Sequence, residues 1–262
     1  MEFALVTGAS SGIGTCFARA LAARGQNVIL VARSKDKLEA LKSEITAQRD
    51  VRVEVIAQDL GVEGAARRLA AAVAERNLTI DLLVNNAGFG AQGEFWKLAL
   101  ERQAQMLQLN ITTLTELTYL LIPAMVERRR GGVINTSSTA SFQPVPYLSV
   151  YAATKSYVTS FSMGLAEELR PYGVKVLAVC PGGTDTNFFA AGRFDPTSFR
   201  GGLQTPEAVV EEALRAYDRG SSLVVTRLIN RLMILGERFV PLRFAAAQAG
   251  KLFRPQTPGT RK

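Results

Sequence analysis

The 262-residue sequence contains no histidine and only two cysteines, Cys16 and Cys180. Without histidine the chain has no Ser-His-Asp or Cys-His catalytic group and no histidine-ligated zinc or haem. Two cysteines are too few for a zinc cluster. The two cysteines could form one disulfide, but nothing else in the sequence suggests an oxidising compartment. We therefore expect no metal site.

Long apolar runs are also missing from the sequence. None approaches the roughly 18 residues that a membrane-spanning helix needs. The first residues, MEFALVTGAS, lack the basic leader of a secretory signal and reach a glycine early. With 47% hydrophobic and 21% charged residues, the composition is that of a globular protein. We therefore expect a cytoplasmic protein.

Positive charge is unevenly distributed along the chain. Residues 223–262 hold eight lysines and arginines and a single acid, Glu237, so they carry seven of the eight net positive charges. A nucleic-acid groove needs basic residues spread over a folded face, so this distribution argues against a nucleic-acid partner.

Apolar, β-branched runs alternate with helical patterns along the chain. Strands are predicted at residues 3–7, 27–32, 51–57, 81–85, 132–136, 174–179 and 222–226, and helices at 11–24, 36–47, 62–76, 96–107, 111–128 and 151–170. This order predicts a single α/β domain, a Rossmann-type doubly wound parallel sheet of about seven strands with helices on both faces. Its ligand should bind at the carboxyl ends of the strands.

A glycine-rich segment joins the first predicted strand to the first predicted helix, Thr7-Gly8-Ala9-Ser10-Ser11-Gly12-Ile13-Gly14. Gly8 permits a tight turn, and Gly12 and Gly14 let the backbone approach a pyrophosphate closely. The helix N-terminus adds free N–H groups and a positive dipole end. A turn without a ligand is the plainer alternative, but this position in the fold favours a bound nucleotide.

The end of the second predicted strand bears on the choice of nucleotide. An acid there would bind the ribose 2′-hydroxyl of NAD, whereas this chain has Val31-Ala32-Arg33-Ser34. Arg33 can pair with a 2′-phosphate through charge-assisted hydrogen bonds, although a merely solvated arginine would leave the same pattern. We therefore expect NADP(H).

Further segments follow in order: Asn85-Asn86-Ala87-Gly88, then Ser138 thirteen residues before Tyr151, then Lys155 four residues after it. With TGASSGIG, they make residues 3–186 resemble the short-chain dehydrogenase/reductase family. The resemblance implies an NADP-dependent enzyme that interconverts a carbonyl and an alcohol on a small molecule. It also implies a homodimer or homotetramer.

The same resemblance implies a role for each matching residue. Asp59 looks like the acid that contacts the adenine, and residues 181–186 look like the loop that grips the nicotinamide carboxamide. The implied catalytic residues are Asn110, Ser138, Tyr151 and Lys155. The implied cofactor-binding residues are Gly8, Ser10, Ser11, Gly12, Ile13, Gly14, Arg33, Ser34, Asp59, Leu60, Asn86, Ala87, Gly88, Tyr151, Lys155, Pro181, Gly182, Thr184 and Thr186.

The chemistry of Tyr151 and Lys155 follows from their spacing. Residues four apart share one face of a helix, and a phenol has a pKa near ~10. A fixed ammonium nearby should draw the pKa of Tyr151 down and make it an acid/base group at neutral pH. Ser138 would donate a hydrogen bond to the substrate oxygen. The family resemblance further implies that Asn110 bends its helix and holds a water, through which it would relay the replacement proton with Lys155.

The substrate pocket is expected to use residues 89–95, residues 140–148 and a lid at about 187–206. These segments are aromatic and carry few charges, which favours a hydrophobic substrate. Their aromatic residues are Phe89, Phe95, Phe142, Tyr147, Phe188, Phe189, Phe194 and Phe199, and the charged residues of the lid are Arg193, Asp195 and Arg200.

The C-terminal segment follows the predicted cofactor domain, residues 1–222. Within residues 223–255, Leu228, Leu232 and Leu235 form one helical stripe, flanked by arginines that include Arg238. This basic amphipathic pattern is compatible with a membrane surface, but packing on the domain or self-association is favoured. Residues 256–262 are expected to be disordered.

Two alternatives to the cytoplasmic carbonyl reductase stay open at this point. One is a non-catalytic NADP-binding regulator or scaffold, which the presence of both Tyr151 and Lys155 disfavours. The other is a membrane-surface enzyme that acts on lipid carbonyls.

Overall fold

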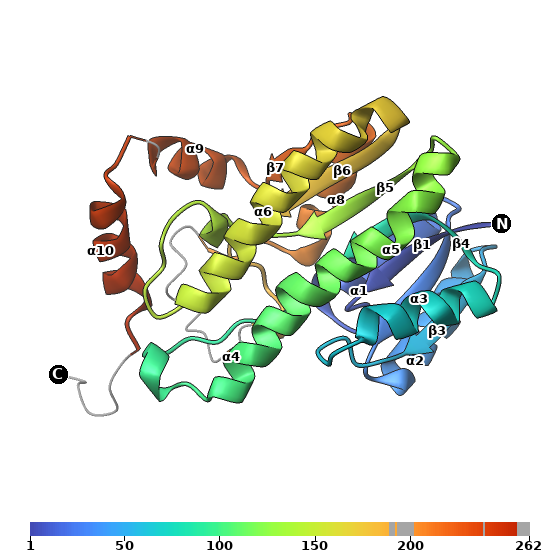
Figure 1. Cartoon of the computed structure of the whole chain (residues 1–262), viewed down its shortest axis with the longest axis horizontal. Coiled ribbons are helices and arrows are strands. Elements are labelled where there is room, and N and C mark those ends of the chain that lie inside the picture. The colour runs from blue at the N-terminus through green and yellow to red at the C-terminus, as the bar shows by residue number, and fades with distance from the viewer. Residues whose placement is uncertain (189–191, 193–201, 238, 256–262) are drawn as a thin grey trace.

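The computed structural model describes residues 1–188, 192, 202–237 and 239–255. Within these residues, seven parallel strands form one sheet in the order β3-β2-β1-β4-β5-β6-β7 (Figure 1). The predicted doubly wound fold is therefore confirmed. The strands are β1 (Glu2–Thr7), β2 (Asn27–Ala32), β3 (Val53–Ala57), β4 (Thr79–Asn85), β5 (Gly131–Thr136), β6 (Val174–Cys180) and β7 (Leu223–Val225).

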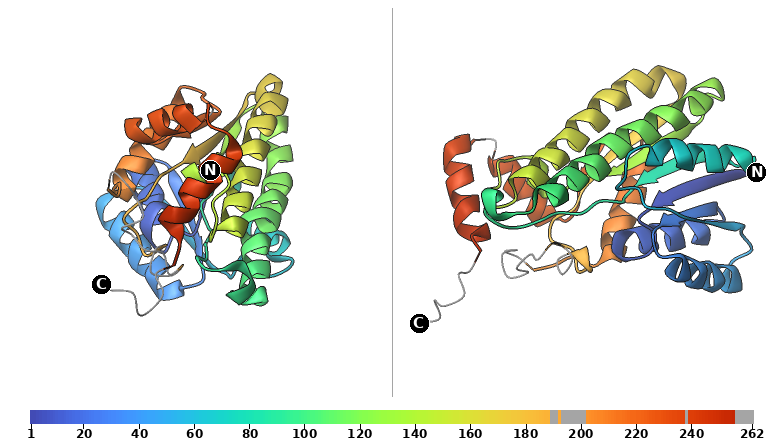
Figure 2. Two further views of the ribbon diagram at one scale, coloured as in Figure 1. Left: turned by 90° about the vertical axis from the view of Figure 1, so that its left-hand side faces the viewer. Right: turned by 60° about the horizontal axis from the view of Figure 1, so that its bottom comes forward.

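Helices cover both faces of this sheet (Figures 1 and 2). One hydrophobic core joins the sheet to α1 (Gly12–Ala23), α2 (Lys35–Gln48) and α8 (Pro206–Asp218). The other joins it to α3 (Ala65–Glu75), α5 (Leu114–Glu127) and α6 (Ser149–Leu169). The central strands are largely apolar because helices bury them from both sides, and the buried Asn85 and Asn135 near their ends hydrogen-bond each other at 2.9 Å.

The two helices predicted around residues 96–128 form one continuous helix from Leu100 to Glu127. It consists of α4 (Leu100–Leu107), a π-helical segment (Gln108–Thr113) and α5, while Trp96 lies in a separate 3₁₀ turn, Phe95–Lys97. The prediction of two helices was wrong because the backbone stays helical through the π segment, which absorbs the irregularity.

The same helix has the length and apolar composition of a membrane span, with a mean hydropathy of 1.3 over its most apolar window. In this fold its α5 part lies on the sheet, where Leu117 and Met125 are fully buried. About 33% of that window is buried, so the core uses only part of the apolar surface of this helix.

The C-terminal part, from residue 223 onward, contributes a strand and two helices to the fold. Residues 223–225 pair with β6 as the seventh strand, as predicted. The domain boundary drawn before residue 223 therefore falls at the start of a strand of the sheet. Two helices follow, α9 (Leu228–Glu237) and α10 (Leu242–Phe253), and they lie beyond the carboxyl ends of the strands (Figure 1).

Candidate active site

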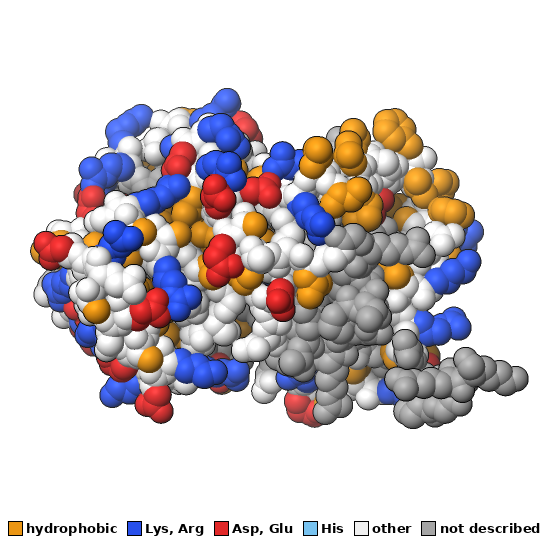
Figure 3. All heavy atoms as spheres, turned by 180° about the vertical axis from the view of Figure 1, so that it is seen from behind, with side chains coloured by type: hydrophobic (Ala, Val, Ile, Leu, Met, Phe, Trp, Pro, Cys, Tyr) orange, Lys and Arg blue, Asp and Glu red, His pale blue; other side chains and the backbone are white. Residues whose placement is uncertain are grey.

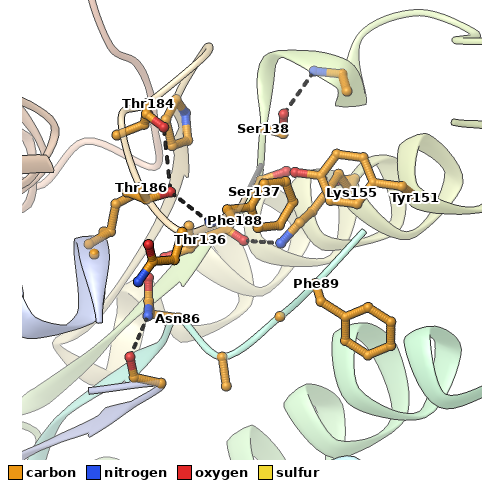
Figure 4. A pocket seen from close by; sticks show the side chains of 18 of the residues that line it. Asn86, Phe89, Thr136, Ser137, Ser138, Tyr151, Lys155, Thr184, Thr186 and Phe188 are labelled. Carbon is orange, nitrogen blue, oxygen red and sulfur yellow. Dashed lines mark hydrogen bonds between the residues drawn. The ribbon is translucent and has the colours of Figure 1, made fainter. Parts of the chain in front are cut away.

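A cleft of about 820 Å³ opens at the carboxyl ends of the parallel strands. Its wall combines the loop after β1, the ends of β2, β4 and β5, helix α6 and the C-terminal helices. Of the predicted site residues, all but Gly14 and Asn110 line it. The side chains labelled in Figure 4 come from the ends of β4 and β5, from α6 and from the segment after β6.

The glycine-rich loop is fixed by hydrogen bonds to the end of β4. Backbone N–H groups of Asn86 and Ala87 donate to the Thr7 hydroxyl at 2.9 and 3.0 Å, and the Asn86 side-chain amide donates to the Thr7 carbonyl at 3.1 Å. Gly8 has φ of +68°, and a Cβ there would lie 2.8 Å from Asn86 Nδ2. Only glycine fits this turn without displacing the loop.

Gly14 does not line the cleft, and its role in this structure is steric. A Cβ at Gly14 would lie 2.2 Å from the carbonyl oxygen of Gly8. The absence of a side chain therefore lets the first turn of α1 approach the loop. This close approach directs the helix N-terminus at the cleft, where free N–H groups can bind an anion.

Basic side chains line the cleft where β2 ends. Arg33 is exposed there, beside Ser34, and Lys37 follows in the first turn of α2. Lys37 was not predicted, although its spacing of four residues from Arg33 was a usable signal. On the other side, the carboxylate of Asp59 accepts a hydrogen bond from the Gly61 N–H at 2.8 Å.

Tyr151 and Lys155 lie one turn apart on α6, with 8% and 6% of their surface exposed. Burial lowers the pKa of Lys155 to about 8. Burial also raises the pKa of Tyr151 to about 12, against a smaller opposite effect of its hydrogen bond with Ser138. Desolvation disfavours the charged form of each group, so Tyr151 keeps its phenolic proton, while a pKa of about 8 still leaves Lys155 mostly protonated at neutral pH.

The expectation that Lys155 lowers the pKa of Tyr151 is wrong for this structure. The Lys155 ammonium donates to the Thr136 carbonyl oxygen at 2.7 Å, and its nitrogen lies 5.8 Å from the centre of the Tyr151 ring. The ammonium is thus directed at the end of β5, and desolvation dominates at the phenol. Sequence spacing placed both residues on one face but did not give the direction of the lysine.

Ser138 and Asn110 take different positions. Ser138 lines the cleft, and its hydroxyl accepts a hydrogen bond from the Ala140 N–H at 3.1 Å. Asn110 is buried in the π-helical segment, where its side chain binds the N–H and carbonyl of Phe89 at 3.2 and 3.0 Å and the Thr154 hydroxyl at 3.1 Å. In this structure Asn110 therefore fixes the loop after β4 from behind the cleft wall.

The aromatic residues predicted for the substrate pocket divide into three groups. Phe89 and Phe188 line the cleft, and the Phe188 ring lies 5.6 Å from the Tyr151 ring. Phe95, Phe142 and Tyr147 do not line the cleft that the described residues form, and Phe95 is 61% exposed. The residues Phe189, Phe194, Phe199, Arg193, Asp195 and Arg200, and most of the predicted lid, lie outside the described residues, as do Arg238 and residues 256–262.

The C-terminal helices supply part of the cleft wall that the sequence did not predict. Met233 and Leu252 line the cleft, with Asn230 and Glu237 from the inner face of α9. The backbone carbonyl of Phe253, another lining residue, accepts a hydrogen bond from the Gln92 side chain at 2.7 Å. These contacts join segments about 160 residues apart in sequence, so only the folded chain reveals them.

Comparison with known proteins gives this geometry a family. The model of the short chain dehydrogenase family matches residues 2–195. The very-long-chain 3-oxoacyl-CoA reductase of Macaca fascicularis is 36% identical over 222 residues, which cover 82% of this chain and 68% of that protein. The human protein of the same name is 39% identical over 184 residues, which cover 69% of this chain and 58% of that protein.

Solved structures extend the likeness to the C-terminal part. A short-chain dehydrogenase from Sphingobium yanoikuyae in complex with NADPH superimposes with a TM-score of 0.83, at 30% identity and with both chains fully covered. A structure that addresses 7β-hydroxysteroid dehydrogenase stereoselectivity gives 0.85 at 25% identity, covering 95% of this chain and 96% of that one. The chain therefore belongs to the short-chain dehydrogenase family, as its glycine loop and its Tyr151–Lys155 pair predicted.

Proposed function

We propose that this chain is an NADP(H)-dependent oxidoreductase that interconverts a carbonyl and an alcohol on a hydrophobic substrate. The observation that carries the proposal is the shared cleft. Its wall holds the glycine loop and Arg33, the polar group of Ser138, Tyr151 and Lys155, and an apolar surface around Phe188. The comparisons support an oxidoreductase of this general reaction class.

The residues around the glycine loop fit an NADP(H) molecule. The glycine loop and Thr186 approach each other so closely that a Cβ at Gly12 would lie 2.9 Å from the Thr186 side chain. The N-terminus of α1 would bind the pyrophosphate, and Arg33 with Lys37 would bind the 2′-phosphate through charge-assisted hydrogen bonds. When bound, the nicotinamide supplies or accepts the hydride.

Tyr151 would act as the acid in the reductive direction. Burial raises its pKa to about 12, so the phenol keeps its proton at neutral pH and can donate it to a carbonyl oxygen. Ser138 lies beside it and would hydrogen-bond the same oxygen as negative charge develops there. Lys155 would hold a ribose hydroxyl from the floor of the cleft, where the Thr136 carbonyl fixes its ammonium.

The substrate that we propose is an acyl chain with a ketone near one end, such as a 3-oxoacyl thioester. The cleft beyond Tyr151 is lined by Val145, Leu148, Phe188, Leu252 and Phe253, which offer an apolar wall. The relatives named very-long-chain 3-oxoacyl-CoA reductase support this substrate class. The match covers only 58% of the human protein, so this chain's own substrate needs its own test.

The direct test is NADPH oxidation, followed by absorbance, with 3-oxoacyl thioesters of increasing chain length. Diketones, steroids and aromatic aldehydes complete the panel, and NADH runs alongside. We expect the specificity constant to rise with chain length, because each buried methylene adds about 0.8 kcal/mol at most. Activity that is confined to short, polar carbonyls would contradict the proposed substrate class.

The rival function is a non-catalytic NADP-binding regulator. It predicts NADPH binding by fluorescence with no turnover on any member of the panel. The orientation of Tyr151, Ser138 and Lys155 into one cleft favours the enzyme, because a mere nucleotide sensor does not need an acid beside an apolar pocket.

We further propose a cytoplasmic homodimer or homotetramer. Both cysteines are free and buried, which agrees with a reducing compartment. Tyr119 on α5 and Tyr157 on α6 are 77% and 37% exposed and offer apolar surface for self-association. Light scattering of the purified chain measures the mass, and a monomer at micromolar concentration would contradict the proposed assembly.

A further inference from the structure

The outer face of α9, the turn that follows it and the start of α10 carry many exposed apolar side chains. Between 51% and 85% of the surface of six side chains in this region is open to solvent. We call these residues the C-terminal apolar patch: Leu228, Ile229, Leu232, Leu235, Phe239 and Leu242. Figure 3 shows hydrophobic side chains gathered over this part of the molecule, at the upper right. Patches of this kind mark interaction surfaces in soluble proteins.

The patch belongs to helices that contact the rest of the fold through a small inner face. On the inner side of α9, Ile234 is buried and the Asn230 amide donates to the Thr226 carbonyl at 2.8 Å. On the inner side of α10, Ala249 packs with Val145 and Leu148. The apolar side chains on the outer side are therefore carried by folded helices, which differ from a tail whose apolar residues all fold back on the domain. The favoured expectation of packing on the domain holds for the inner faces alone.

Charge distinguishes between the occupants that could cover this patch. Arg243 and Lys251 are exposed on α10, and neither has an acidic partner within ion-pair distance among the described residues. Arg254 follows and donates to the Tyr147 hydroxyl at 3.1 Å. The one acid of this segment, Glu237, lines the cleft on the inner side instead. The outer surface thus combines apolar side chains with unpaired cations.

We propose that the outer faces of α9 and α10 dock on an anionic lipid membrane surface, with the apolar patch in the acyl boundary and Arg243 and Lys251 at the headgroups. Interfacial helices have this combination of an apolar face and flanking cations. A second copy fits less well, because pairing two copies of this surface would bring the Arg243 and Lys251 cations of both into one interface.

Docking in this way would bring the mouth of the cleft to the lipid. Met233, Leu252 and Phe253 belong to the same two helices and line the cleft from the inside. An apolar substrate could then pass between bilayer and cleft along the C-terminal helices. Vesicle binding needs no substrate, so failure of the proposed reaction would leave this surface proposal standing, and the reverse also holds.

The experiment is co-sedimentation of the full chain with vesicles, without cofactor or substrate. One set contains phosphatidylcholine alone and the other contains equal parts of phosphatidylcholine and phosphatidylglycerol. At about 0.15 M salt we expect at least a tenfold preference for the anionic vesicles, which weakens as salt shortens the screening length. Equal or absent binding to the two sets would overturn the proposal.

Two variants locate the binding surface. The triple variant Leu232→Glu, Leu235→Glu, Phe239→Glu should abolish binding to anionic vesicles. The double variant Arg243→Glu, Lys251→Glu should weaken it about tenfold or more, because each cation near an anionic surface contributes measurably. The five substituted side chains are exposed, so both variants should fold. If the triple variant does not fold, the double variant still tests the proposal.

Matched controls distinguish vesicle binding through this patch from non-specific attraction of a basic protein to anionic lipid. Tyr172→Glu changes a side chain that is 45% exposed, in the 3₁₀ turn that follows α6. Arg67→Glu reverses an exposed charge on α3. Both should bind vesicles like the unchanged protein. If they lose binding as the patch variants do, attraction is non-specific and the proposal is wrong.

Light scattering tests the competing occupant. If the unchanged chain ignores vesicles and the triple variant has a smaller mass in solution, a second copy covers the patch and the proposal is overturned. If the triple variant keeps the mass of the unchanged chain and loses vesicle binding, the lipid surface is supported.

Discussion

The nucleotide edge and the C-terminal helices border the same cleft but are held in opposite ways. At the nucleotide edge, Thr7 and Asn86 exchange several hydrogen bonds, and glycines fill positions where a Cβ would clash. In α9 and α10, buried side chains are few: Ile234, Ala245 and Ala249. The first region is fixed by short-range constraints that tolerate little change. The second attaches through a small inner face and leaves its outer face free for another purpose.

The two regions should therefore have different roles: the nucleotide edge in cofactor use and catalysis, and the C-terminal helices in the choice of substrate. The groups that we propose to bind the cofactor and move a proton lie in the constrained region. The groups that we propose to contact the substrate chain, such as Met233 and Phe253, belong to the lightly attached helices. Changes in the constrained region should therefore act on turnover and cofactor use, and changes in the C-terminal helices on substrate affinity.

The largest effect should come from Tyr151→Phe. Removing the phenolic proton donor should reduce kcat by roughly 10²- to 10⁴-fold, the usual contribution of a general acid. NADPH affinity should change little, since the ring remains. Steady-state kinetics and fluorescence titration measure the two quantities. Tyr157→Phe, on the outer side of the same helix, is the control and should keep full activity; a near-normal kcat in Tyr151→Phe would refute the assigned acid.

Cofactor preference should respond next to Arg33→Asp. Loss of the cation, together with repulsion of the 2′-phosphate, should shift the ratio of specificity constants for NADPH and NADH by roughly 10- to 100-fold toward NADH. The comparison is made in one assay with both cofactors. Arg49→Asp at the other end of α2 should leave the ratio unchanged. If Arg33→Asp behaves like that control, Lys37 alone binds the phosphate or the assignment fails.

A third prediction concerns the pH dependence of stability without cofactor. Burial lowers the pKa of Lys155 from its ordinary 10.5 to about 8, so between these values the unfolded chain binds more protons than the folded one. Stability therefore rises with pH across this window. Relative to Lys155→Met, the unchanged protein should gain about 2 kcal/mol between pH ~7.5 and ~9.5.

Urea unfolding at the two pH values measures this gain. Lys35→Met, which removes an exposed lysine, should show no such pH-dependent difference from the unchanged protein. An equal difference between the unchanged protein and Lys155→Met at both pH values would show that Lys155 keeps an ordinary pKa in the fold.

The smallest effect should come from Phe253→Ala. The side chain lines the cleft but is only half-buried, so its loss should raise KM for a long-chain carbonyl several-fold and leave kcat nearly unchanged. Phe95→Ala is the control, because Phe95 is 61% exposed and away from the cleft lining. Equal KM values for the two variants would show that the C-terminal helices do not form the substrate wall.

Much of the nucleotide edge could be predicted because its constraints are local in sequence. The glycine loop joins β1 directly to α1, and Tyr151 and Lys155 lie one helical turn apart. Such spacing fixes which side chains share a face. It does not fix where a flexible side chain points, so the hydrogen bond from Lys155 to Thr136, and with it the high pKa of Tyr151, was missed.

The substrate wall was predicted less well for a related reason. The aromatic residues after β4 and β5 lie near the cleft in sequence, yet Phe95 and Tyr147 do not line it, while Leu252 lines it from more than 100 residues later in the chain. Which side chain faces a cavity depends on how loops and late helices pack across the sheet. The pattern of hydrophobic residues within one segment does not predict that packing.

By itself the sequence determined the sheet, the position of the cofactor loop and the identity of the candidate acid, because strand burial, backbone freedom and helical spacing are properties of short stretches. Tertiary structure alone decided that Asn110 supports Phe89 from behind the cleft wall, that burial governs the pKa values of Tyr151 and Lys155, and that α9 and α10 face the cleft on one side and solvent on the other. Desolvation and long-range contacts arise only when distant segments meet.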